Sequence, residues 1–260
     1  MVELKKPQIK WTEDKKKYLI ENYPYSDKKK MCIELGCTYK ALKSMARNLE
    51  VKSLVDKNFY KLKKLIDDNE YNNYWWGYIL ADGHINERNQ LSVIIKRNDS
   101  QHLEKLSNYL GVKLKCRKIK THYTNGEYCN FTCQDAKYGE TLKKILGISK
   151  NKTYNCISFD WINTKEKFLS VFAGFYDGDG CLEKNKKGTP IAMKIECHYN
   201  WIKFLEFCSI KLKEYYNIES VTYITTRGSS AMRIYKCENI MLLFSECKKY
   251  ELPLLERKWI

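Results

Sequence analysis

The chain lacks the patterns that mark several common protein classes. None of its apolar runs approaches the roughly 18 residues needed to cross a membrane, and its charged N-terminal stretch has no apolar core of a signal peptide. It also contains no Gly-rich loop that would cradle phosphate and no Ser/His/Asp nucleophile spacing. These absences argue against a membrane protein, a secreted protein and a P-loop enzyme, and they predict a cytoplasmic protein.

The cysteines also lack a recognisable arrangement. There are 11, without any C-x-x-C pair, so we expect reduced thiols that mostly fill the core. Cys129-x₃-Cys133 and Cys197-His198 have zinc-ligand types, but both fall within predicted strands, and we expect no zinc site there.

Acidic residues are much fewer than basic residues. The chain has 31 acidic and 47 basic residues, a formal net charge of +16, together with a 13% aromatic content. An AT-biased genome rich in lysine codons explains part of the lysine content but not the imbalance. The composition therefore predicts a polyanionic partner.

One short pattern occurs twice, as Gly77-Tyr-Ile-Leu-Ala-Asp-Gly83 and Gly174-Phe-Tyr-Asp-Gly-Asp-Gly180. Each copy predicts an apolar helix that ends in an acid, followed by a glycine in the left-handed conformation. Small residues recur at i and i+4 in both copies, which predicts that the two helices pack closely along these stripes. The alternative for each copy alone is an ordinary core helix ended by an Asp-Gly turn.

Such packing brings Asp82 and Asp179 together at the negative ends of both helix dipoles. Two carboxylates there repel each other, so the arrangement predicts a bound divalent cation. Oxygen ligands without a Cys/His framework favour Mg²⁺. The expected ligands are the two carboxylates and the backbone carbonyls of Ala81 and Gly178.

The elements after each motif repeat in one order, which predicts an α+β fold of two pseudo-symmetric αββαββα units, residues 71–155 and 156–260. In the first unit we expect strands at 90–96, 113–122 and 127–133, the last two joined by a turn at Asn125-Gly126, and helices at 99–110 and 136–146. In the second unit we expect strands at 181–186, 191–197, 220–226 and 231–235, and helices at 201–216 and 239–247.

The segments Trp75 to Gly83 and Phe172 to Gly180 resemble the LAGLIDADG motif of homing endonucleases, although Leu80 replaces the upstream motif acid in the first copy. The resemblance covers residues 71–260. It implies that two antiparallel sheets form a DNA-binding saddle over the major groove of a long, pseudo-palindromic duplex target. It also implies cleavage with Mg²⁺, for which Mn²⁺ substitutes, whereas Ca²⁺ binds without supporting cleavage. Because both motifs lie in one chain, we expect a monomer.

The resemblance and the strand pattern nominate functional residues. Basic residues at the unit exits are candidates to support catalysis, with two strand lysines as weaker ones: Lys150, Lys152, Arg257, Lys258, Lys96 and Lys194. The sheet candidates for DNA contact are Lys113, Lys115, Arg117, Lys118, Lys120, Thr222, Thr225, Thr226, Arg227 and Arg233. A maturase that binds intron RNA and a regulator that binds DNA without cleaving it remain alternatives. The expected setting is a bacterial or phage-infected cell, with an organellar matrix as an alternative.

The first 50 residues predict a separate all-α module. Thr12 is the expected N-cap of a helix that ends near Asn22, and further helices are expected at 27–35 and 38–49. The third carries Lys40, Lys43 and Arg47 on one side, which suggests a helix-turn-helix that resembles Myb-like DNA-binding modules. A generic three-helix cap or a dimerisation piece is the alternative, and residues 51–70 are the expected linker.

Overall fold

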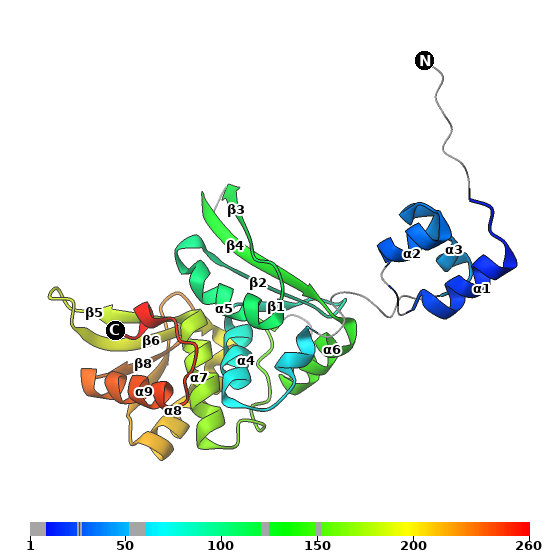
Figure 1. Ribbon diagram of the computed structural model, residues 1–260. Helices are drawn as coiled ribbons and strands as arrows, with labels where there is room; N and C mark the ends of the chain where they lie inside the picture. Colours follow the sequence, from blue (N-terminus) through cyan, green and yellow to red (C-terminus); the bar gives the residue numbers. More distant parts are fainter. Residues whose placement is uncertain (1–8, 25, 27, 52–60, 121–124, 149–151) are drawn as a thin grey trace. The chain divides into compact units, whose positions relative to one another are not determined.

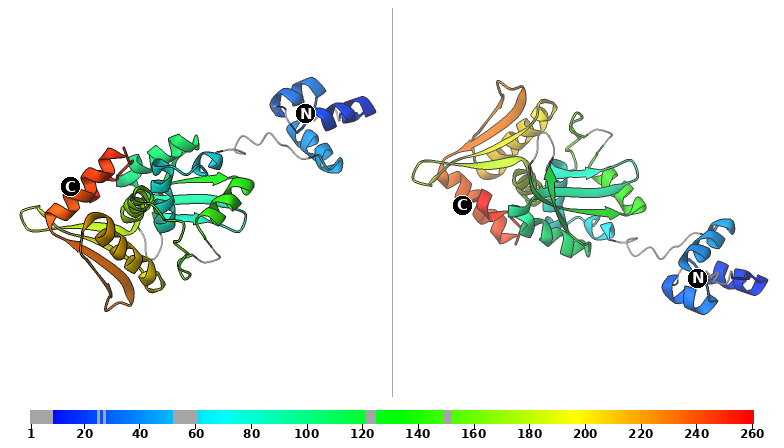
Figure 2. Two further views of the ribbon diagram at one scale, coloured as in Figure 1. Left: turned by 90° about the horizontal axis from the view of Figure 1, so that it is seen from below. Right: turned by 90° about the horizontal axis from the view of Figure 1, so that it is seen from above.

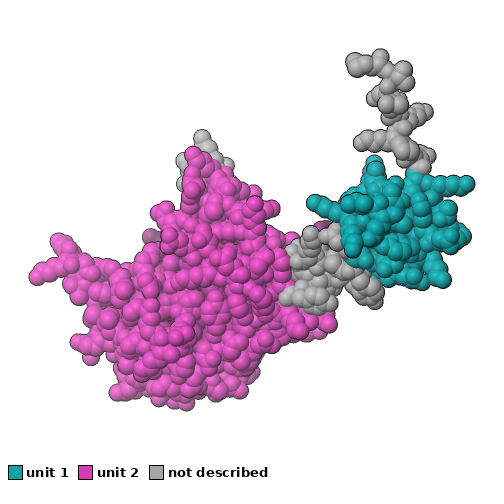
Figure 3. Space-filling model, in the orientation of Figure 1, with its two compact units in different colours: residues 1–59 teal, residues 60–260 magenta. Residues whose placement is uncertain are grey.

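The computed structural model describes residues 9–24, 26, 28–51, 61–120, 125–148 and 152–260 (Figure 1). The chain divides into two compact units, residues 1–59 and 60–260 (Figure 3). Each unit has its own hydrophobic core. None of the helices in the described parts of the chain is long and apolar enough to span a membrane.

The N-terminal unit contains three short helices, α1 (Glu13–Asn22), α2 (Lys28–Leu35) and α3 (Tyr39–Asn48). Thr12 and Thr38 cap α1 and α3 as N-cap residues, because their side chains accept hydrogen bonds from the backbone amides of Lys15 and Ala41. The apolar sides of the helices meet in a small core that includes Leu19, Met31, Leu35, Leu42 and Ala46.

The C-terminal unit repeats one set of elements twice, which confirms the predicted αββαββα order. The first set is α4 (Glu70–Asp82), β1 (Gly83–Ile85), β2 (Gln90–Lys96), α5 (Ser100–Leu110), β3 (Lys115–Lys120), β4 (Asn125–Gln134) and α6 (Ala136–Ile145). The second set is α7 (Lys165–Asp179), β5 (Gly180–Lys184), β6 (Pro190–His198), α8 (Ile202–Tyr216), β7 (Ser220–Ile224), β8 (Ser229–Tyr235) and α9 (Cys237–Lys249). Short 3₁₀ turns occur at Leu62–Leu65, Arg97–Asp99, Tyr199–Trp201 and Glu256–Lys258.

The strands form two antiparallel sheets of equal topology. The first sheet has the order β1-β2-β4-β3, and the second has the order β5-β6-β8-β7. In each sheet, alternate side chains such as Val93 and Ile195 point into the core. Helices α5 and α6 pack on the core side of the first sheet, and α8 and α9 pack on that of the second. The opposite side of each sheet, which carries residues such as Lys96 and Arg233, is called its open face below.

Helices α4 and α7 pack against each other at the centre of this unit (Figure 2). A Cβ atom on Gly77 would lie 2.0 Å from the carbonyl oxygen of Val171, and one on Gly174 would lie 1.8 Å from that of Tyr74. A Cβ on Gly178 would lie 2.3 Å from that of Ala81. The two backbones therefore touch along the small-residue stripes, as the sequence predicted.

The glycines after the motif acids differ from the prediction. Gly83 and Gly180 have φ of −80° and −93°, so both are extended rather than left-handed. They are required for another reason: a Cβ would lie 2.8 Å from the Cα of Ile79 or 2.1 Å from the ring of Tyr176. In each unit, the chain passes directly from the motif helix into a strand, and the glycine at this point lies against the last turn of the helix.

Two further expectations are corrected by contacts between distant segments. The segment Leu62–Leu65 lies in the predicted linker, but the side chains of Leu62 and Leu65 are fully buried in the core of the C-terminal unit. Asn125 and Gly126, expected to form a turn, belong to β4 and pair with Lys120 and Ile119 of β3. The connection between these strands consequently falls at residues 121–124, outside the described residues.

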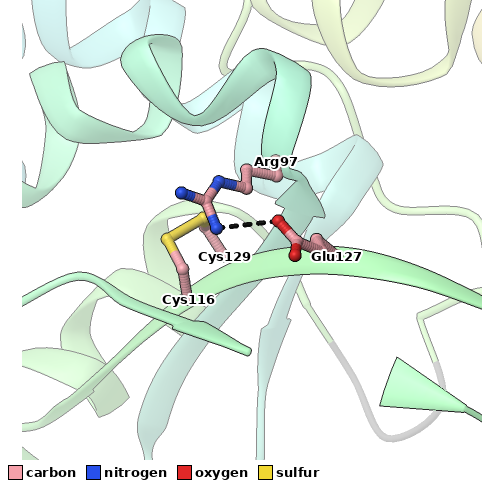
Figure 4. The surroundings of a disulfide bond; sticks show 4 residues. All are labelled: Arg97, Cys116, Glu127 and Cys129. Atoms are coloured by element: carbon pink, nitrogen blue, oxygen red, sulfur yellow. Dashed lines mark hydrogen bonds and ion pairs between the residues drawn. A yellow bond between two sulfur atoms is a disulfide. The ribbon is translucent and has the colours of Figure 1, made fainter. Parts of the chain in front are cut away.

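The expectation that all cysteines are reduced is wrong. Cys116 of β3 and Cys129 of β4 form a disulfide, with their Cα atoms 4.0 Å apart (Figure 4). The two residues are direct partners in the strand register, which places their side chains together. The other nine cysteines are free, and only three of them, Cys133, Cys208 and Cys247, are buried, so fewer thiols fill the core than the sequence predicted.

Candidate functional site

The two motif acids are the last residues of α4 and α7. Asp179 is half-buried, and this burial, together with the negative charge of Asp82, raises the pKa of its carboxyl to about 7. Asp82 keeps solvent access, but its surroundings desolvate the carboxyl and raise its pKa as well. The close helix packing thus brings both carboxylates into one electrostatic site, as the small-residue stripes predicted.

Two lysines cap the C-terminal turns of these helices. The Nζ of Lys152 donates to the carbonyl oxygens of Ile79, Leu80 and Ala81 at 2.6, 2.6 and 3.0 Å. At the equivalent place on α7, the Nζ of Lys258 donates to the carbonyls of Asp177 and Gly178 at 2.6 and 2.8 Å. Each ammonium group therefore satisfies carbonyls at the negative end of a helix dipole.

Burial also changes the protonation of these lysines. It lowers the pKa of Lys152 to about 8, although the charges of Asp179 and Asp82 act in the opposite direction. Burial lowers the pKa of Lys258 as well. The site consequently contains two carboxylates and two amines whose pKa values converge toward neutrality, a combination that is typical of groups that exchange protons.

The other basic residues nominated from sequence lie elsewhere or are paired. Arg257 forms a bidentate ion pair with Asp99, through Nε to Oδ1 and Nη2 to Oδ2, both at 2.5 Å. Lys96 and Arg257 line a hollow of about 610 Å³ that also contains Asp82 and Lys258. Lys194 is on β6, where it pairs with Glu196 at 2.5 Å. Lys150 lies outside the described residues.

The donor set can be tested against the expected Mg²⁺. The carbonyls of Ala81 and Gly178, which we expected as ligands, accept hydrogen bonds from Lys152 and Lys258 in this structure. Within the described parts of the chain, no group of three or more His, Cys, Asp or Glu is arranged around a common point. Two carboxylates still fit Mg²⁺, because this ion commonly keeps several waters and takes one or two carboxylates together with phosphate oxygens of a substrate.

Asp177, the upstream acid of the second motif, is buried in a polar network. Its carboxylate accepts hydrogen bonds from the hydroxyl of Tyr74 at 2.5 Å, the amide of Leu255 at 2.8 Å and the indole of Trp259 at 2.8 Å. Burial raises its pKa to about 6. Because Tyr74 donates to Asp177, the neighbouring Nε2 of His102, 3.0 Å away, donates to Tyr74. This network joins both motif helices to the C-terminal segment, and no local sequence pattern predicts it.

The strand register divides the candidate DNA-contact residues of the first sheet. Lys115 and Arg117 pair with Asn130 and Tyr128 and belong to the open face. Lys118 pairs with Glu127 on the opposite side, where their charged groups are 3.8 Å apart. Because side chains alternate along a strand, Lys118 lies on the face away from Lys115 and Arg117. Lys113 precedes β3, and the backbone of Lys120, the last residue of β3, pairs with that of Asn125.

The second sheet divides its candidates in the same way. Arg233 lies on the open face and pairs with Glu183 at 2.5 Å. Thr222 is in register with the core residue Met232, so it lies on the covered side and not on the expected DNA face. Thr225, Thr226 and Arg227 are in the connection between β7 and β8. In the N-terminal unit, the predicted contacts Lys40, Lys43 and Arg47 are exposed on α3 and line a hollow of about 910 Å³.

The paired motif helices, the two equivalent sheets and the acids at the helix ends define a two-unit LAGLIDADG-like fold. Among solved structures, the chain is similar to the homing endonuclease I-WcaI bound to its DNA recognition sequence, with a TM-score of 0.55 and 14% identity over 76% of this chain and 87% of that one. It is also similar to full-length DUF199/WhiA from Thermatoga maritima, with a TM-score of 0.48 and 16% identity over 77% of this chain and 66% of that one.

Sequence comparisons add little to this likeness. No family model matches the chain. A curated relative, described as a probable phosphoenolpyruvate synthase of Methanocaldococcus jannaschii, is 24% identical over 183 residues, which are 70% of this chain but 14% of that protein. A match to so small a part of a protein carries none of that protein's activity to this chain.

Proposed function

We propose that the protein is a site-specific endonuclease that cleaves both strands of duplex DNA by hydrolysis with Mg²⁺. The observation that carries this proposal is the pair Asp82 and Asp179 at the ends of two helices whose backbones touch. The likeness to I-WcaI supports the fold on which such a site is built. The basic open face of the first sheet and the formal charge of +16 support a polyanionic substrate.

In this proposal the DNA lies along the open faces, so that its backbone passes the ends of α4 and α7. Asp82 and Asp179 would hold Mg²⁺, which would supply Lewis acidity and lower the pKa of a water at the site. Asp179, whose pKa of about 7 leaves it partly protonated near neutrality, would be held in its ionised form beside a bound cation.

The two capping lysines have the chemistry to assist. The Nζ of Lys152, with a pKa of about 8, holds or releases a proton near neutral pH, and its charged form stabilises negative charge that develops on a nearby phosphate. Lys258 occupies the equivalent place beside α7, where its charged form stabilises negative charge on the second strand. Asp177 takes no part in the chemistry, since its oxygens are engaged inside the protein.

The proposal is tested with the full-length protein and a randomised duplex library. Duplexes that bind in Ca²⁺ are enriched, and the enriched pool is then incubated with Mg²⁺ to look for double-strand breaks. Asp82→Asn and Asp179→Asn each remove one negative charge from the site while keeping its shape. We expect binding to survive in both variants and cleavage to fall at least roughly a hundredfold.

Asp160→Asn is a matched control, because Asp160 is exposed and its side chain accepts a hydrogen bond from the nearby Ser158. It should leave cleavage unchanged. Wild-type cleavage by both site variants would overturn the assignment of the acids. Specific duplex binding by the wild type without cleavage would indicate a non-cleaving regulator, and preferential binding of folded intron RNA would indicate a maturase.

A further inference from the structure

The open faces of the two sheets differ in charge, although the sheets share one topology. Gly83 pairs with Val93 in the first sheet, and Gly180 pairs with Ile195 in the second, so these two pairs occupy equivalent positions. One residue earlier along β2, Ser92 pairs with Thr132 of β4. At the equivalent position in the second unit, Lys194 of β6 pairs with Arg233 of β8. The two halves of the pseudo-symmetric surface therefore present different chemistry at equivalent positions.

The open face of the first sheet is basic and contains no acid among its described residues. Lys115 and Arg117 are exposed on it, in register with Asn130 and Tyr128. The only acid of these strands in the described residues, Glu127, lies on the opposite side with Lys118 and Arg97. Exposed cations without neighbouring carboxylates are suited to phosphate oxygens.

The open face of the second sheet is neutralised by internal ion pairs. Glu183 accepts from Arg233, and Glu196 accepts from Lys194, both at 2.5 Å, and the four side chains are 20–34% exposed. Ser229 also donates to Glu196 at 2.5 Å. These contacts raise the pKa of Arg233 and of Lys194 and lower the pKa of Glu196, so all three stay charged at neutral pH.

A neutral row of paired charges is poorly suited to phosphates, because each cation already has a partner and each carboxylate repels the backbone. It is well suited to base edges in the major groove. Arginine donates to O6 and N7 of guanine, and glutamate accepts from the N4 amino group of cytosine. Half-burial and the carboxylate partner also hold the Arg233 guanidinium in one place, which geometric readout requires.

We propose that the second sheet reads G·C base pairs through Arg233 and Glu183, whereas the first sheet holds the phosphate backbone through Lys115 and Arg117. The inference rests on the proposed function in that the ligand is duplex DNA. It makes the two halves of the target unequal: one half carries the sequence requirement close to the cleavage site, and the other carries most of the electrostatic attraction.

The test uses the full-length protein in Ca²⁺ and the duplexes enriched from the randomised library. Arg233→Gln and Arg117→Gln are a matched pair, since the same substitution is made on the two open faces. We expect Arg233→Gln to weaken binding to the consensus roughly tenfold or more and to abolish the preference at one G·C position. Arg117→Gln should weaken binding to every duplex alike and reduce the slope of log affinity against log salt by about 1.

A third variant guards against loss of folding in Arg233→Gln. Glu183→Gln keeps the shape and frees the guanidinium, so it should weaken the same G·C preference while strengthening binding to random duplexes. The inference is overturned if Arg233→Gln or Glu183→Gln leaves the consensus unchanged, or if Arg117→Gln removes a base preference. Failure of the wild type to bind any duplex would instead overturn the proposed function, before any variant is compared.

Discussion

Replacement of Asp179 by asparagine should stabilise the protein above neutral pH. In the folded protein the carboxyl pKa is about 7, whereas the ordinary value is 3.8. A carboxyl with a raised pKa contributes stability that is fully present below its unfolded pKa and is lost as pH rises through the folded pKa. At pH 8 the folded wild type must therefore hold a half-buried carboxylate beside Asp82, and Asp179→Asn removes that cost.

The size of the effect follows from the pKa. Between pH 5 and pH 7 the folded carboxyl binds a proton that the unfolded one has lost, which corresponds to about 3 kcal/mol at about 1.4 kcal/mol per pH unit. Because Asp179 retains partial solvent access, we discount this to about 1–2 kcal/mol. The Tm of the variant minus that of the wild type should then be roughly 2–8 °C larger at pH 8 than at pH 5.

The assay is thermal unfolding in EDTA, followed by tryptophan fluorescence at pH 5, 6, 7 and 8. Trp75, Trp76, Trp201 and Trp259 are buried in the C-terminal unit, so the signal reports its unfolding. The difference between variant and wild type isolates Asp179 from His102 and Asp177, which titrate in both proteins. A difference that stays constant from pH 5 to pH 8 would refute the reasoning. Addition of Mg²⁺ at pH 8 should stabilise the wild type more than the variant.

Four other predictions concern the stability of the fold and the role of the N-terminal unit. Asp177→Asn should lower the free energy of unfolding by about 2–4 kcal/mol, because three buried donors lose a charged acceptor; an unchanged urea midpoint would contradict this. Gly174→Ala should cost at least about 3 kcal/mol, since its Cβ meets backbone, whereas Gly126→Ala, whose nearest contact is 3.4 Å, should cost little. Reduction with dithiothreitol should destabilise the wild type by up to about 3 kcal/mol and leave Cys116→Ser unaffected, as measured by urea unfolding. Deletion of residues 1–50 should weaken DNA binding and lower its salt slope while metal-dependent cleavage remains, and equal binding by the truncated protein would refute a DNA-binding role of α3.

The helix pair could be predicted because it depends on residues close in sequence. Gly77 and Gly174 mark the stripes directly, and the acids follow at a fixed place in each helix. The order of strands and helices also followed from local apolar patterns. Lys152 and Lys258 are candidates only through the family resemblance. Their hydrogen bonds to helix carbonyls could not be predicted, because the two lysines lie far from the motifs in sequence.

The remaining features depend on register and on distant segments. Alternation alone does not say which residue of β3 faces which residue of β4, so the Cys116–Cys129 bond and the separation of Lys118 from Lys115 were missed. The conformations of Gly83 and Gly180 were also missed, because a left-handed turn and a close contact both require glycine. The buried role of Asp177 needs Trp259, which is 82 residues further along the chain.

The packing of α4 also affects how the chain is synthesised. Every residue from Asn72 to Leu80 is buried in the folded protein, so α4 has no side suited to water. Its partner contact from Tyr74 to Asp177 spans 103 residues. At roughly 5–20 residues per second, the ribosome needs about 5–20 s to deliver that partner after α4 has emerged. During this interval the nascent chain contains an aromatic-rich segment without the partner that buries it in the folded protein.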